Sequence, residues 1–365
     1  MGIKKKILIV VGTRPNIIKV TQFKKLALRS EILEVKIVHT GQHYDKEMAS
    51  SFFDQLGVNP DFFLNVPATS ANEQIAHILM GLEKVCAEYG PDMIMAVGDV
   101  NSTLAASLAA NKIGIRLAHL EAGLRSHDRG MPEEHNRIIT DYLSDIFFVT
   151  EVSGRDNLIL EGKQQGSIHW VGNTMIDTLI AFEKEIMASD ILEELGVQKS
   201  EYVLITMHRP SNVDSQEGLE KIISLIAYFC DRHKVIFPAH PRTLSRIKEF
   251  NLQDRLEEKS GSLLVTEPKD YFSFQRLIAD CKFVVTDSGG IQEETTFRGV
   301  PCFTLRSNTE RPSTLVDGTN VLATFDNIRT LITDRMSGTI EASVPPLWDG
   351  KATERIIAVL ERELN

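Results

Sequence analysis

Short apolar runs alternate with amphipathic stretches of helical period from one end of the chain to the other. Strands that alternate with helices in this way predict parallel sheets with crossover helices. In the first half the predicted strands are Lys6–Val11, Val35–Thr40, Met93–Val97, Arg116–Leu120, Ile146–Val149 and Ile168–Val171. In the second half they are Val203–Met207, Val235–Pro238, Leu263–Thr266, Phe283–Thr286 and Cys302–Leu305. The pattern therefore predicts an α/β protein with two doubly wound domains of about 170 residues each.

The intervening stretches predict the helices of both domains. They include Ile17–Arg29, Lys46–Leu56, Ala71–Glu88, Ser102–Lys112, Pro132–Leu143, Ser153–Glu161 and the last helix, Thr353–Leu364. A helix at Thr174–Met187 and the polar segment Ala188–Glu201 are predicted to connect the two halves.

Residues whose side chains could bind a ligand or take part in catalysis follow the ends of the predicted strands, where parallel sheets bind their ligands. These loops are Gly12–Asn16, Gly41–Asp45, Gly98–Thr103, His119–Ser126, His208–Asn212 and His240–Arg242. Two domains that direct such loops at a shared cleft would enclose one elongated ligand, such as a nucleotide sugar.

One turn in the second half predicts a phosphate site. The strand Phe283–Thr286 is followed by Ser288, Gly289 and Gly290, and then by a helix whose first amides have no partner within the helix. Those amides and the helix dipole favour a phosphate, and Glu294 could reach a ribose hydroxyl one turn later. The same kind of turn also occurs in proteins without a ligand.

Three carboxylates follow neighbouring strands of the first half, namely Asp99, Glu121 and Glu133. Each has a plainer interpretation, because Asp99 can cap a helix and Glu133 lies in a first helical turn, where acids are favoured. Glu121 is the least easily explained by packing or capping. Carboxylates crowded at one sheet edge have shifted pKa values and suit proton transfer.

Several cations follow other strand ends. Arg14 could clamp a diphosphate, although it could also be a surface arginine on a turn. Lys19 is a further candidate, against its plainer interpretation as a solvated helix residue. His208 and His240 could be structural histidines, and the turn at Arg311 could hold an acidic side chain or a ligand phosphate. A metal site from His119, Glu121, His208 and His240 is not expected, because no two of them form an i, i+4 ligand pair.

The composition is that of an ordinary globular protein, with 42% hydrophobic and 25% charged residues among 365. No apolar run approaches the roughly 20 residues of a membrane span, and the five apolar residues Ile7–Val11 are too few for a signal peptide. The four cysteines are far apart and fit a reducing compartment. The net charge of −10 argues against nucleic-acid binding. We expect a cytoplasmic protein without membrane or nucleic-acid partners.

The combination of motifs is similar to that of the non-hydrolysing UDP-N-acetylglucosamine 2-epimerases, over essentially the whole chain. The motifs are Gly12-Thr13-Arg14-Pro15, Gly98-Asp99-Val100-Asn101-Ser102-Thr103, His119-Leu120-Glu121-Ala122-Gly123-Leu124-Arg125-Ser126, Met131-Pro132-Glu133-Glu134-His135-Asn136-Arg137, Asp287-Ser288-Gly289-Gly290-Ile291-Gln292-Glu293-Glu294 and Thr309-Glu310-Arg311-Pro312. The resemblance implies a GT-B architecture, with two Rossmann-like domains facing a central cleft. It implies a domain of residues 1–171 plus 352–365 with the catalytic carboxylates, and a UDP-binding domain of residues 172–351. It also implies a homodimer, and an enzyme that needs neither a cofactor nor a metal.

Carried over position by position, the resemblance implies roles for individual residues. The catalytic candidates are Asp99, Glu121, Glu133 and His208, and the candidates for UDP binding are Arg14, His240, Ser288, Gly289, Gly290, Glu294 and Arg311. Three departures from the family pattern stand out. Part of the family reads Gln-His-Arg-Gln where this chain has Gln42-His43-Tyr44-Asp45, and His-Arg-Arg where it has His208-Arg209-Pro210, which puts activation by a second UDP-sugar in doubt. Asn16 replaces the usual glutamate.

The expected reaction is reversible C2 epimerisation of UDP-N-acetylglucosamine to UDP-N-acetylmannosamine, by elimination of UDP to a 2-acetamidoglucal and re-addition. The alternatives are 2-epimerisation of a UDP-2,3-diacetamido uronic acid, a GT-B glycosyltransferase, a hydrolysing epimerase and a non-catalytic sensor of nucleotide sugars. A uronic acid would require an extra cation, for which Arg125, Arg137 and Arg209 are candidates. NAD binding is not expected, because Gly12-Thr13-Arg14-Pro15 departs from the dinucleotide pattern.

Overall fold

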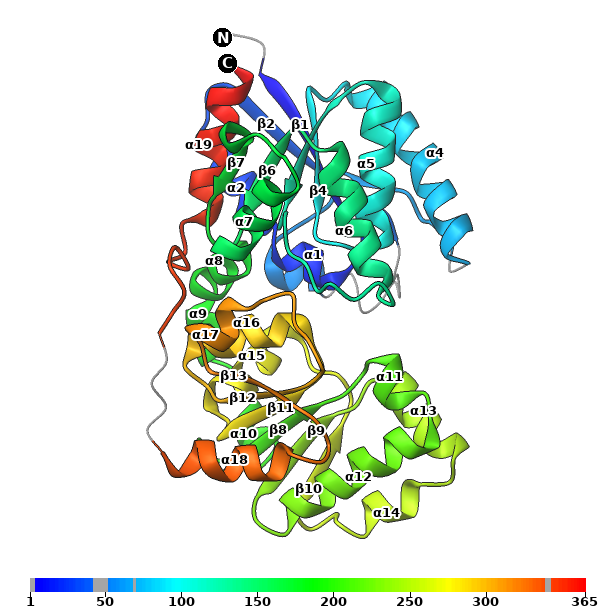
Figure 1. Cartoon of the computed structure of the whole chain (residues 1–365), viewed down its shortest axis with the longest axis vertical. Helices are drawn as coiled ribbons and strands as arrows, with labels where there is room; N and C mark the ends of the chain where they lie inside the picture. Colours follow the sequence, from blue (N-terminus) through cyan, green and yellow to red (C-terminus); the bar gives the residue numbers. More distant parts are fainter. Residues whose placement is uncertain (1–3, 42–51, 68–69, 339–342) are drawn as a thin grey trace. The chain divides into compact units, whose positions relative to one another are not determined.

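The computed structural model of the 365-residue chain describes residues 4–41, 52–67, 70–338 and 343–365. The segment Gln42 to Asp45, and most of the helix predicted over Lys46–Leu56, lie outside the described residues. The chain forms two compact units, residues 1–181 with 346–365 and residues 182–345 (Figure 1).

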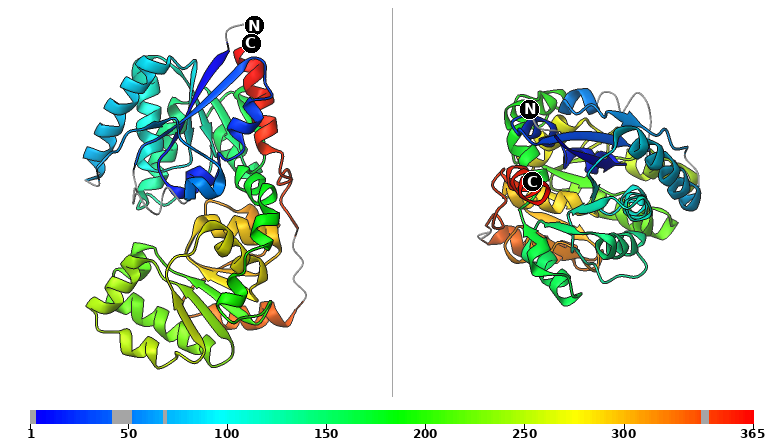
Figure 2. Two further views of the ribbon diagram at one scale, coloured as in Figure 1. Left: turned by 180° about the vertical axis from the view of Figure 1, so that it is seen from behind. Right: turned by 90° about the horizontal axis from the view of Figure 1, so that it is seen from above.

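The first unit is built on a seven-stranded parallel sheet in the order β3-β2-β1-β4-β5-β6-β7. Its strands are β1 (Lys5–Val11), β2 (Leu33–His39), β3 (Phe62–Phe63), β4 (Met93–Val97), β5 (Arg116–Leu120), β6 (Ile146–Val149) and β7 (Ile168–Trp170). Its helices are α1 (Arg14–Ile18), α2 (Phe23–Ala27), α4 (Ala71–Tyr89), α5 (Asn101–Ile113), α6 (Pro132–Leu143), α7 (Val152–Leu160), α8 (Thr174–Ala181) and α19 (Ala352–Leu364), with a 3-10 turn at Gln165–Ser167. Helices α4 and α5 cover one face of the sheet, and α2 and α19 cover the other (Figure 2). All side chains of β4 are therefore buried, as expected for a strand covered on both faces.

The predicted helix Ile17–Arg29 is wrong, because the structure has two short helices, α1 and α2, in this region. The break follows Ile18, whose carbonyl accepts a hydrogen bond of 2.5 Å from the Thr178 hydroxyl on α8. The Thr21 hydroxyl lies 2.6 Å from the same Thr178 oxygen. A contact from a distant helix therefore replaces the continuation of the local hydrogen-bond ladder.

The last helix, α19, belongs to the first unit. The Asp177 carboxylate of α8 accepts hydrogen bonds from the first amides of α19, Ala352 at 3.1 Å and Thr353 at 2.6 Å. The Trp348 indole donates to the Thr150 carbonyl at 3.2 Å. These contacts satisfy helix-end donors that would otherwise be unpaired.

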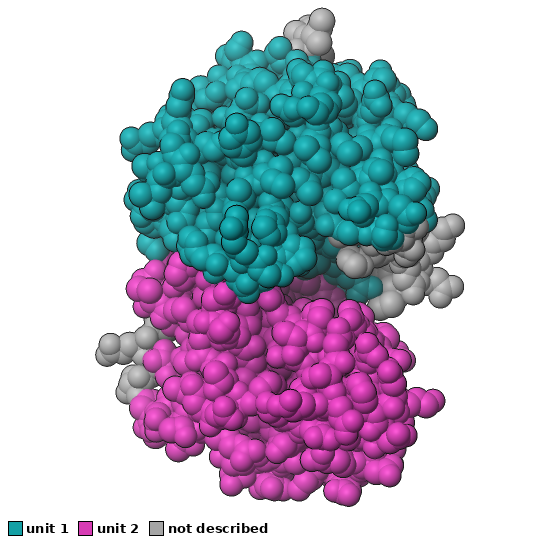
Figure 3. Space-filling model, turned by 45° about the vertical axis from the view of Figure 1, so that its right-hand side comes forward, with its two compact units in different colours: residues 1–181, 346–365 teal, residues 182–345 magenta. Residues whose placement is uncertain are grey.

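The boundaries between the units differ from those predicted at residues 171/172 and 351/352. They lie at 181/182 and 345/346, as the two colours of Figure 3 show. Helix α8 stays with the first unit because its Asp177 and Thr178 bond to α19 and α1.

The second unit contains a six-stranded parallel sheet in the order β10-β9-β8-β11-β12-β13. Its strands are β8 (Tyr202–Thr206), β9 (Lys234–Pro238), β10 (Leu263–Thr266), β11 (Phe283–Thr286), β12 (Cys302–Leu305) and β13 (Asn320–Ala323). Its helices are α9 (Glu183–Met187), α10 (Ile191–Glu194), α11 (Pro210–Val213), α12 (Gln216–Cys230), α13 (Pro241–Glu249), α14 (Gln253–Glu257), α15 (Tyr271–Asp280), α16 (Gly289–Arg298), α17 (Ser313–Val316) and α18 (Ile328–Ser337). The strands predicted from the apolar runs are confirmed, and β3 and β13 are additional short edge strands.

No helix of the described residues has the length and apolar character needed to cross a membrane. The four cysteines are buried thiols that form no disulfide.

Candidate active site

Asp99 and Glu121 follow the carboxyl ends of the adjacent strands β4 and β5, whose last residues pair as Val97 with Leu120. Between β4 and Asp99 stands Gly98, with φ of +69°. A Cβ added to Gly98 would lie 3.0 Å from Asn16 Nδ2, 3.4 Å from Lys19 Nζ and 3.8 Å from Glu121 Oε2. Glycine therefore lets the chain pass close to the Glu121 carboxylate in a left-handed conformation.

Glu121 is buried and forms an ion pair with Lys19. The exposed fractions of the two side chains are only 6% and 9%. The interpretation of Lys19 as a solvated helix residue is therefore wrong. Its position at the C-terminal end of α1 points the ammonium toward β5, where it supplies the charge that a buried carboxylate needs.

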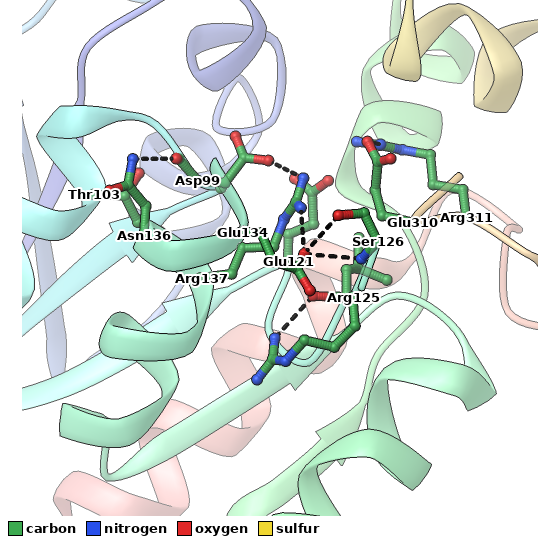
Figure 4. A network of polar contacts seen from close by, with 12 residues as sticks. Asp99, Thr103, Glu121, Arg125, Ser126, Glu134, Asn136, Arg137, Glu310 and Arg311 are labelled. Carbon is green, nitrogen blue, oxygen red and sulfur yellow. Dashed lines mark hydrogen bonds and ion pairs between the residues drawn. The ribbon is translucent and has the colours of Figure 1, made fainter. Parts of the chain in front are cut away.

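Asp99 is more open, with 22% of its side chain exposed, and is paired with Arg137 of α6 (Figure 4). The side-chain amide of Asn136 donates to the backbone carbonyl of Asp99 at 2.9 Å. Arg137 Nη1 also lies 3.3 Å from Glu134 Oε2. Helix α6 thus holds Asp99 by both its side chain and its backbone.

Two neighbouring acids of α6 differ in their surroundings. Glu134 is buried and accepts hydrogen bonds from the Ser126 amide at 2.8 Å, the Ser126 hydroxyl at 2.9 Å and the His127 amide at 3.0 Å. Glu133 is half-buried, and its carboxylate has no ion pair or hydrogen bond with the residues that the structure describes. Of the two, Glu133 is the acid that a ligand could engage.

In the second unit, the loop after β8 is tied to the end of β11 by Asp287. This carboxylate is fully buried and accepts from the amides of His208 at 3.2 Å and Arg209 at 3.0 Å and from Asn212 Nδ2 at 3.0 Å. His208 Nδ1 lies 3.0 Å from it, while half of the His208 side chain is exposed. Burial alone would raise the pKa of Asp287, but the hydrogen bonds and charge of His208 and the bonds from Asn212 and Arg209 lower it overall. Asp287 therefore holds the His208 loop, and the N-cap of α16 is the next residue, Ser288.

The strand–Gly-Gly–helix turn is present, with Ser288 as the N-cap of α16. The guanidinium of Arg311 packs on it, because a Cβ added to Gly289 would lie 2.7 Å from Arg311 Nη1. Arg311 is itself buried between two acids, with its Nε 2.9 Å from Glu293 Oε2 and an ion pair to Glu310. Because Arg311 already has these two carboxylate partners, it supports the turn from the protein side.

Glu294 of α16 is buried, and burial raises its pKa to about 7, although a hydrogen bond from Gln275 and the charge of Arg298 oppose this. His240 lies at the surface as the N-cap of α13, where its Nδ1 accepts from the Arg242 amide at 3.2 Å. Arg14 is half-buried at the start of α1, with its guanidinium carbon 5.8 Å from the ring centroid of Phe52.

The structure thus groups the candidates within each unit. In the first unit, Asp99 is paired with Arg137 and Glu121 with Lys19. In the second unit, Gly289 lies against Arg311. Glu133, Glu294, His240 and Arg14 are not in these contacts. Sequence reasoning missed the pairing of Arg137 with Asp99, for which the only signal was the position of Arg137 in the same motif as Glu133.

The structure also accounts for two residues that the sequence analysis weighed for other roles. His119, considered for a metal site, is fully buried, and its two ring nitrogens bond to Asp141 at 2.6 Å and to the Gly98 carbonyl at 2.8 Å. Arg125, considered as a ligand for a sugar carboxylate, is buried in ion pairs of 2.7 Å with Asp141 and Glu161. Among the described residues, no cluster of three or more His, Cys, Asp or Glu side chains is suited to a metal ion.

Two doubly wound units, one with carboxylates at strand ends and one with a strand–Gly-Gly–helix turn, define a protein of the GT-B class. The family model for UDP-N-acetylglucosamine 2-epimerase matches residues 25–361. The chain is 39% identical to the UDP-N-acetylglucosamine 2-epimerase of Methanocaldococcus jannaschii over 97% of this chain and 98% of the relative. It is 35% identical to the UDP-2,3-diacetamido-2,3-dideoxy-D-glucuronate 2-epimerase of Pseudomonas aeruginosa over 98% and 99%. The chain belongs to the UDP-N-acetylglucosamine 2-epimerase family.

Solved structures support the same assignment. The M. jannaschii UDP-GlcNAc 2-epimerase in complex with UDP-GlcNAc and UDP matches with a TM-score of 0.90 and 36% identity, over 98% of this chain and 99% of that one. The UDP-GlcNAc-bound enzyme of Neisseria meningitidis matches with a TM-score of 0.89 and 29% identity, over 98% and 100%. The predicted fold class is therefore confirmed.

Proposed function

We propose that this protein interconverts UDP-N-acetylglucosamine and UDP-N-acetylmannosamine by inverting C2 of the sugar, without hydrolysing the nucleotide sugar. The observation that carries the proposal is the pair of carboxylates at adjacent strand ends, Asp99 and Glu121, each with its own buried cation. Inversion of a carbon centre by proton transfer requires proton-handling groups on both of its faces, so one acid would not suffice.

The chemistry sets the order of the steps. The C2 hydrogen is not next to a carbonyl group, so a carboxylate cannot remove it until positive charge develops at C1. Departure of UDP creates that charge, and loss of the C2 proton to a carboxylate then gives a 2-acetamidoglucal beside UDP. Protonation of C2 from the opposite face and return of UDP to C1 give the manno product, so the net reaction consumes no water and no cofactor.

The second unit supplies the groups that suit the leaving nucleotide. We propose that the first amides of α16, at Gly289 and Gly290, bind the diphosphate, because a negative charge at a helix N-terminus is stabilised by the dipole. His240 and Arg311 of the second unit, and Arg14 and Lys19 of the first, remain proposed contacts of UDP, and Glu294 a proposed contact of the ribose. His208 is proposed as a catalytic contact because its half-exposed ring is fixed by the buried Asp287.

In the first unit, Asp99 and Glu121 are proposed to exchange protons with C2. Glu133 is proposed as a second proton carrier, because its carboxylate, unlike that of Glu134, has no ion pair or hydrogen bond with the described residues. The cations Lys19 and Arg137 keep two nearby carboxylates compatible with each other.

The reaction predicts that wild-type protein incubated with UDP-N-acetylglucosamine in D₂O incorporates deuterium at C2 with no acceptor present. Both epimers should accumulate as nucleotide sugars in the proton NMR spectrum. Glu121→Gln should lower turnover by roughly 10²–10⁴-fold, because it removes a proton-transfer group without changing its size. Free N-acetylmannosamine would indicate a hydrolysing enzyme, and the absence of deuterium would exclude epimerisation.

A second candidate substrate is a UDP-2,3-diacetamido uronic acid, which the 35% identity to the P. aeruginosa enzyme favours. Its carboxylate needs a cation, and two of the three predicted cations, Arg125 and Arg137, are buried in ion pairs with acids of the protein. Comparison of kcat/KM for the two substrates decides between them, and we expect the uncharged sugar to be preferred.

We also propose that the protein works as a homodimer. Helix α6 buries polar side chains, and it exposes the apolar side chains Ile138, Ile139 and Tyr142 by 43%, 39% and 77%. A helix with its apolar face outward is stabilised when a second copy covers that face. Light scattering of wild type and Tyr142→Glu tests this proposal. Leu28→Glu is the control, because Leu28 is 84% exposed and lies on the opposite face of the sheet.

A further inference from the structure

A buried cluster of charges lies beneath the two loops that carry Asp99 and Glu121. It consists of His119 of β5, Arg125 of the following loop and Asp141 of α6, with Glu161 at its edge. The side chains of His119 and Asp141 are fully buried, and that of Arg125 is 2% exposed. Buried charges are costly unless they are paired and hydrogen-bonded, so each contact of this cluster matters.

Asp141 is linked to both loops. One carboxylate oxygen lies 2.6 Å from His119 Nδ1, and His119 Nε2 lies 2.8 Å from the carbonyl oxygen of Gly98, the residue before Asp99. The other oxygen accepts a hydrogen bond of 3.1 Å from the amide of Gly123, two residues after Glu121. The same oxygen lies 2.7 Å from Arg125 Nη2. One carboxylate therefore connects the backbones of the two strand-end loops.

The hydrogen bonds also define the charge of His119. A carbonyl oxygen and a carboxylate oxygen can only accept, so both ring nitrogens of His119 must donate, and the ring is an imidazolium. Burial alone would raise the pKa of Asp141, but His119 and Arg125 reverse this and lower it below its ordinary value. The cluster thus contains two cations and two anions, with Glu161 accepting from Arg125 Nε at 2.8 Å.

The loop after β5 needs such support because its backbone is unusual. Glu121 has φ of +73°, a left-handed conformation that side chains other than glycine rarely adopt. A conformation of this kind persists only when the surroundings fix it. Here the amides of Glu121 and Ala122 both donate to the Phe148 carbonyl at 3.0 Å, and the Gly123 amide donates to Asp141.

We propose that Asp141 is a positioning residue for this active site, which holds Asp99 in place through His119 and Gly98 and holds Glu121 in place through Gly123. The inference rests on the proposed epimerase function and deepens it. Asp141 is fully buried and does not touch the sugar, so its effect on turnover passes through the two acids.

Two substitutions separate the effect of the Asp141 hydrogen bonds from the effect of its negative charge. In Asp141→Asn, the side-chain amide can donate to Nδ1 of a neutral His119, whose Nε2–H still donates to Gly98, and the amide oxygen still accepts from Gly123. We expect kcat to stay within about tenfold of wild type. In Asp141→Leu all links are lost, and we expect kcat to fall by about 10²-fold or more, because misplaced catalytic groups cost about that factor.

Ligand affinity and ring protonation provide readouts that a loss of folding alone would not give. The KM for the nucleotide sugar and the Kd for UDP should change less than about threefold in both variants, since the partners of the Asp141 side chain (His119, Gly123 and Arg125) are not among the residues proposed to contact UDP. In ¹⁵N-labelled protein, the His119 ring should show two N–H protons in wild type and one in Asp141→Asn. Asp280→Asn is the matched control, because Asp280 is equally buried in an ion pair, with Arg276, in the second unit and should leave kcat unchanged.

The proposal is overturned if Asp141→Leu retains wild-type kcat, if Asp141→Asn loses as much as Asp141→Leu, or if wild-type His119 carries one ring proton. Should Asp141→Leu not fold, His119→Leu replaces it: this breaks the link to Gly98 and keeps that to Gly123, so we expect a smaller fall in kcat at unchanged UDP affinity, and a wild-type kcat would overturn the link to Asp99. Wild-type protein that incorporates no deuterium would refute the epimerase function itself, and the ring protons would still report on the cluster.

Discussion

The two units share one sheet architecture but differ in the groups that they place at the strand ends. In the first unit the proposed site consists of paired side-chain charges, Lys19 with Glu121 and Arg137 with Asp99. In the second unit the proposed site consists of the backbone amides of Gly289 and Gly290, with Arg311 packed against Gly289. Proton transfer needs fixed carboxylates and is therefore sensitive to charge, whereas phosphate binding needs exposed amides and is sensitive to added bulk.

The largest effect should come from loss of a charge partner in the first unit. Lys19→Met leaves the Glu121 carboxylate buried without its cation, which should lower the free energy of unfolding by about 3–5 kcal/mol. Turnover should fall as well, because the position and charge of Glu121 both change. Urea unfolding and deuterium incorporation measure the two effects.

Lys25→Met is the control, because Lys25 lies at the surface of α2. A Lys19→Met protein with wild-type stability would show that the ion pair does not maintain the first unit. Weaker UDP binding with unchanged turnover would instead favour the predicted contact between Lys19 and the diphosphate.

The second unit contains one buried acid that should make stability depend on pH. The pKa of Glu294 is raised to about 7 from 4.5, so the folded protein holds a proton that the unfolded chain releases. Its contribution is fully present below pH 4.5 and is lost as the pH rises through about 7, which amounts to about 3 kcal/mol at most. Glu294→Gln should therefore be more stable relative to wild type at pH 8 than at pH 5.

Urea unfolding at the two pH values measures this difference. Glu258→Gln, which changes an exposed acid of the same unit, should show no such change with pH. A constant difference between Glu294→Gln and wild type at both pH values would contradict the prediction.

The smallest effect should come from a single methyl group added at the strand–Gly-Gly–helix turn, which is proposed to bind phosphate. Gly289→Ala places a Cβ 2.7 Å from Arg311 Nη1 and 3.0 Å from Glu310 Oε1, and the ion pairs of these side chains limit their movement. We expect the turn to shift and UDP to bind about 10-fold more weakly, a loss of about 1.4 kcal/mol in binding free energy. Calorimetry with UDP measures it.

Gly261→Ala is the matched control, because a Cβ at Gly261 would have no atom within 4 Å. Equal UDP affinity in Gly289→Ala and wild type would show that the turn tolerates bulk, and the proposed contrast between the units would fail there.

The sequence predicted both sheets and the ends of their inner strands, because buried parallel strands are continuous apolar runs bounded by glycine and polar residues. It failed at α1 and α2, where Thr178, 160 residues further along the chain, bonds to Ile18. Periodicity in a local window cannot register a contact at that separation.

The same limit applies to the candidate site. The strand-end positions of Asp99 and Glu121 follow from the sheet pattern, but their partners Lys19 and Arg137 come from α1 and α6 and depend on tertiary packing. The side chain of Lys19 could be expected in solvent from its sequence, and only the position of Glu121 explains its burial. The catalytic and binding roles of all these residues stay predictions until the substitutions are measured.

The return of α19 to the first unit has a consequence for synthesis on the ribosome. Residues 182–345 form a continuous segment that can fold as soon as it emerges, whereas the first unit lacks residues 346–365 until these too have been translated. The unit whose synthesis starts first is therefore completed after the other, and a nonsense mutation before codon 346 would damage the first unit although it leaves residues 1–181 intact.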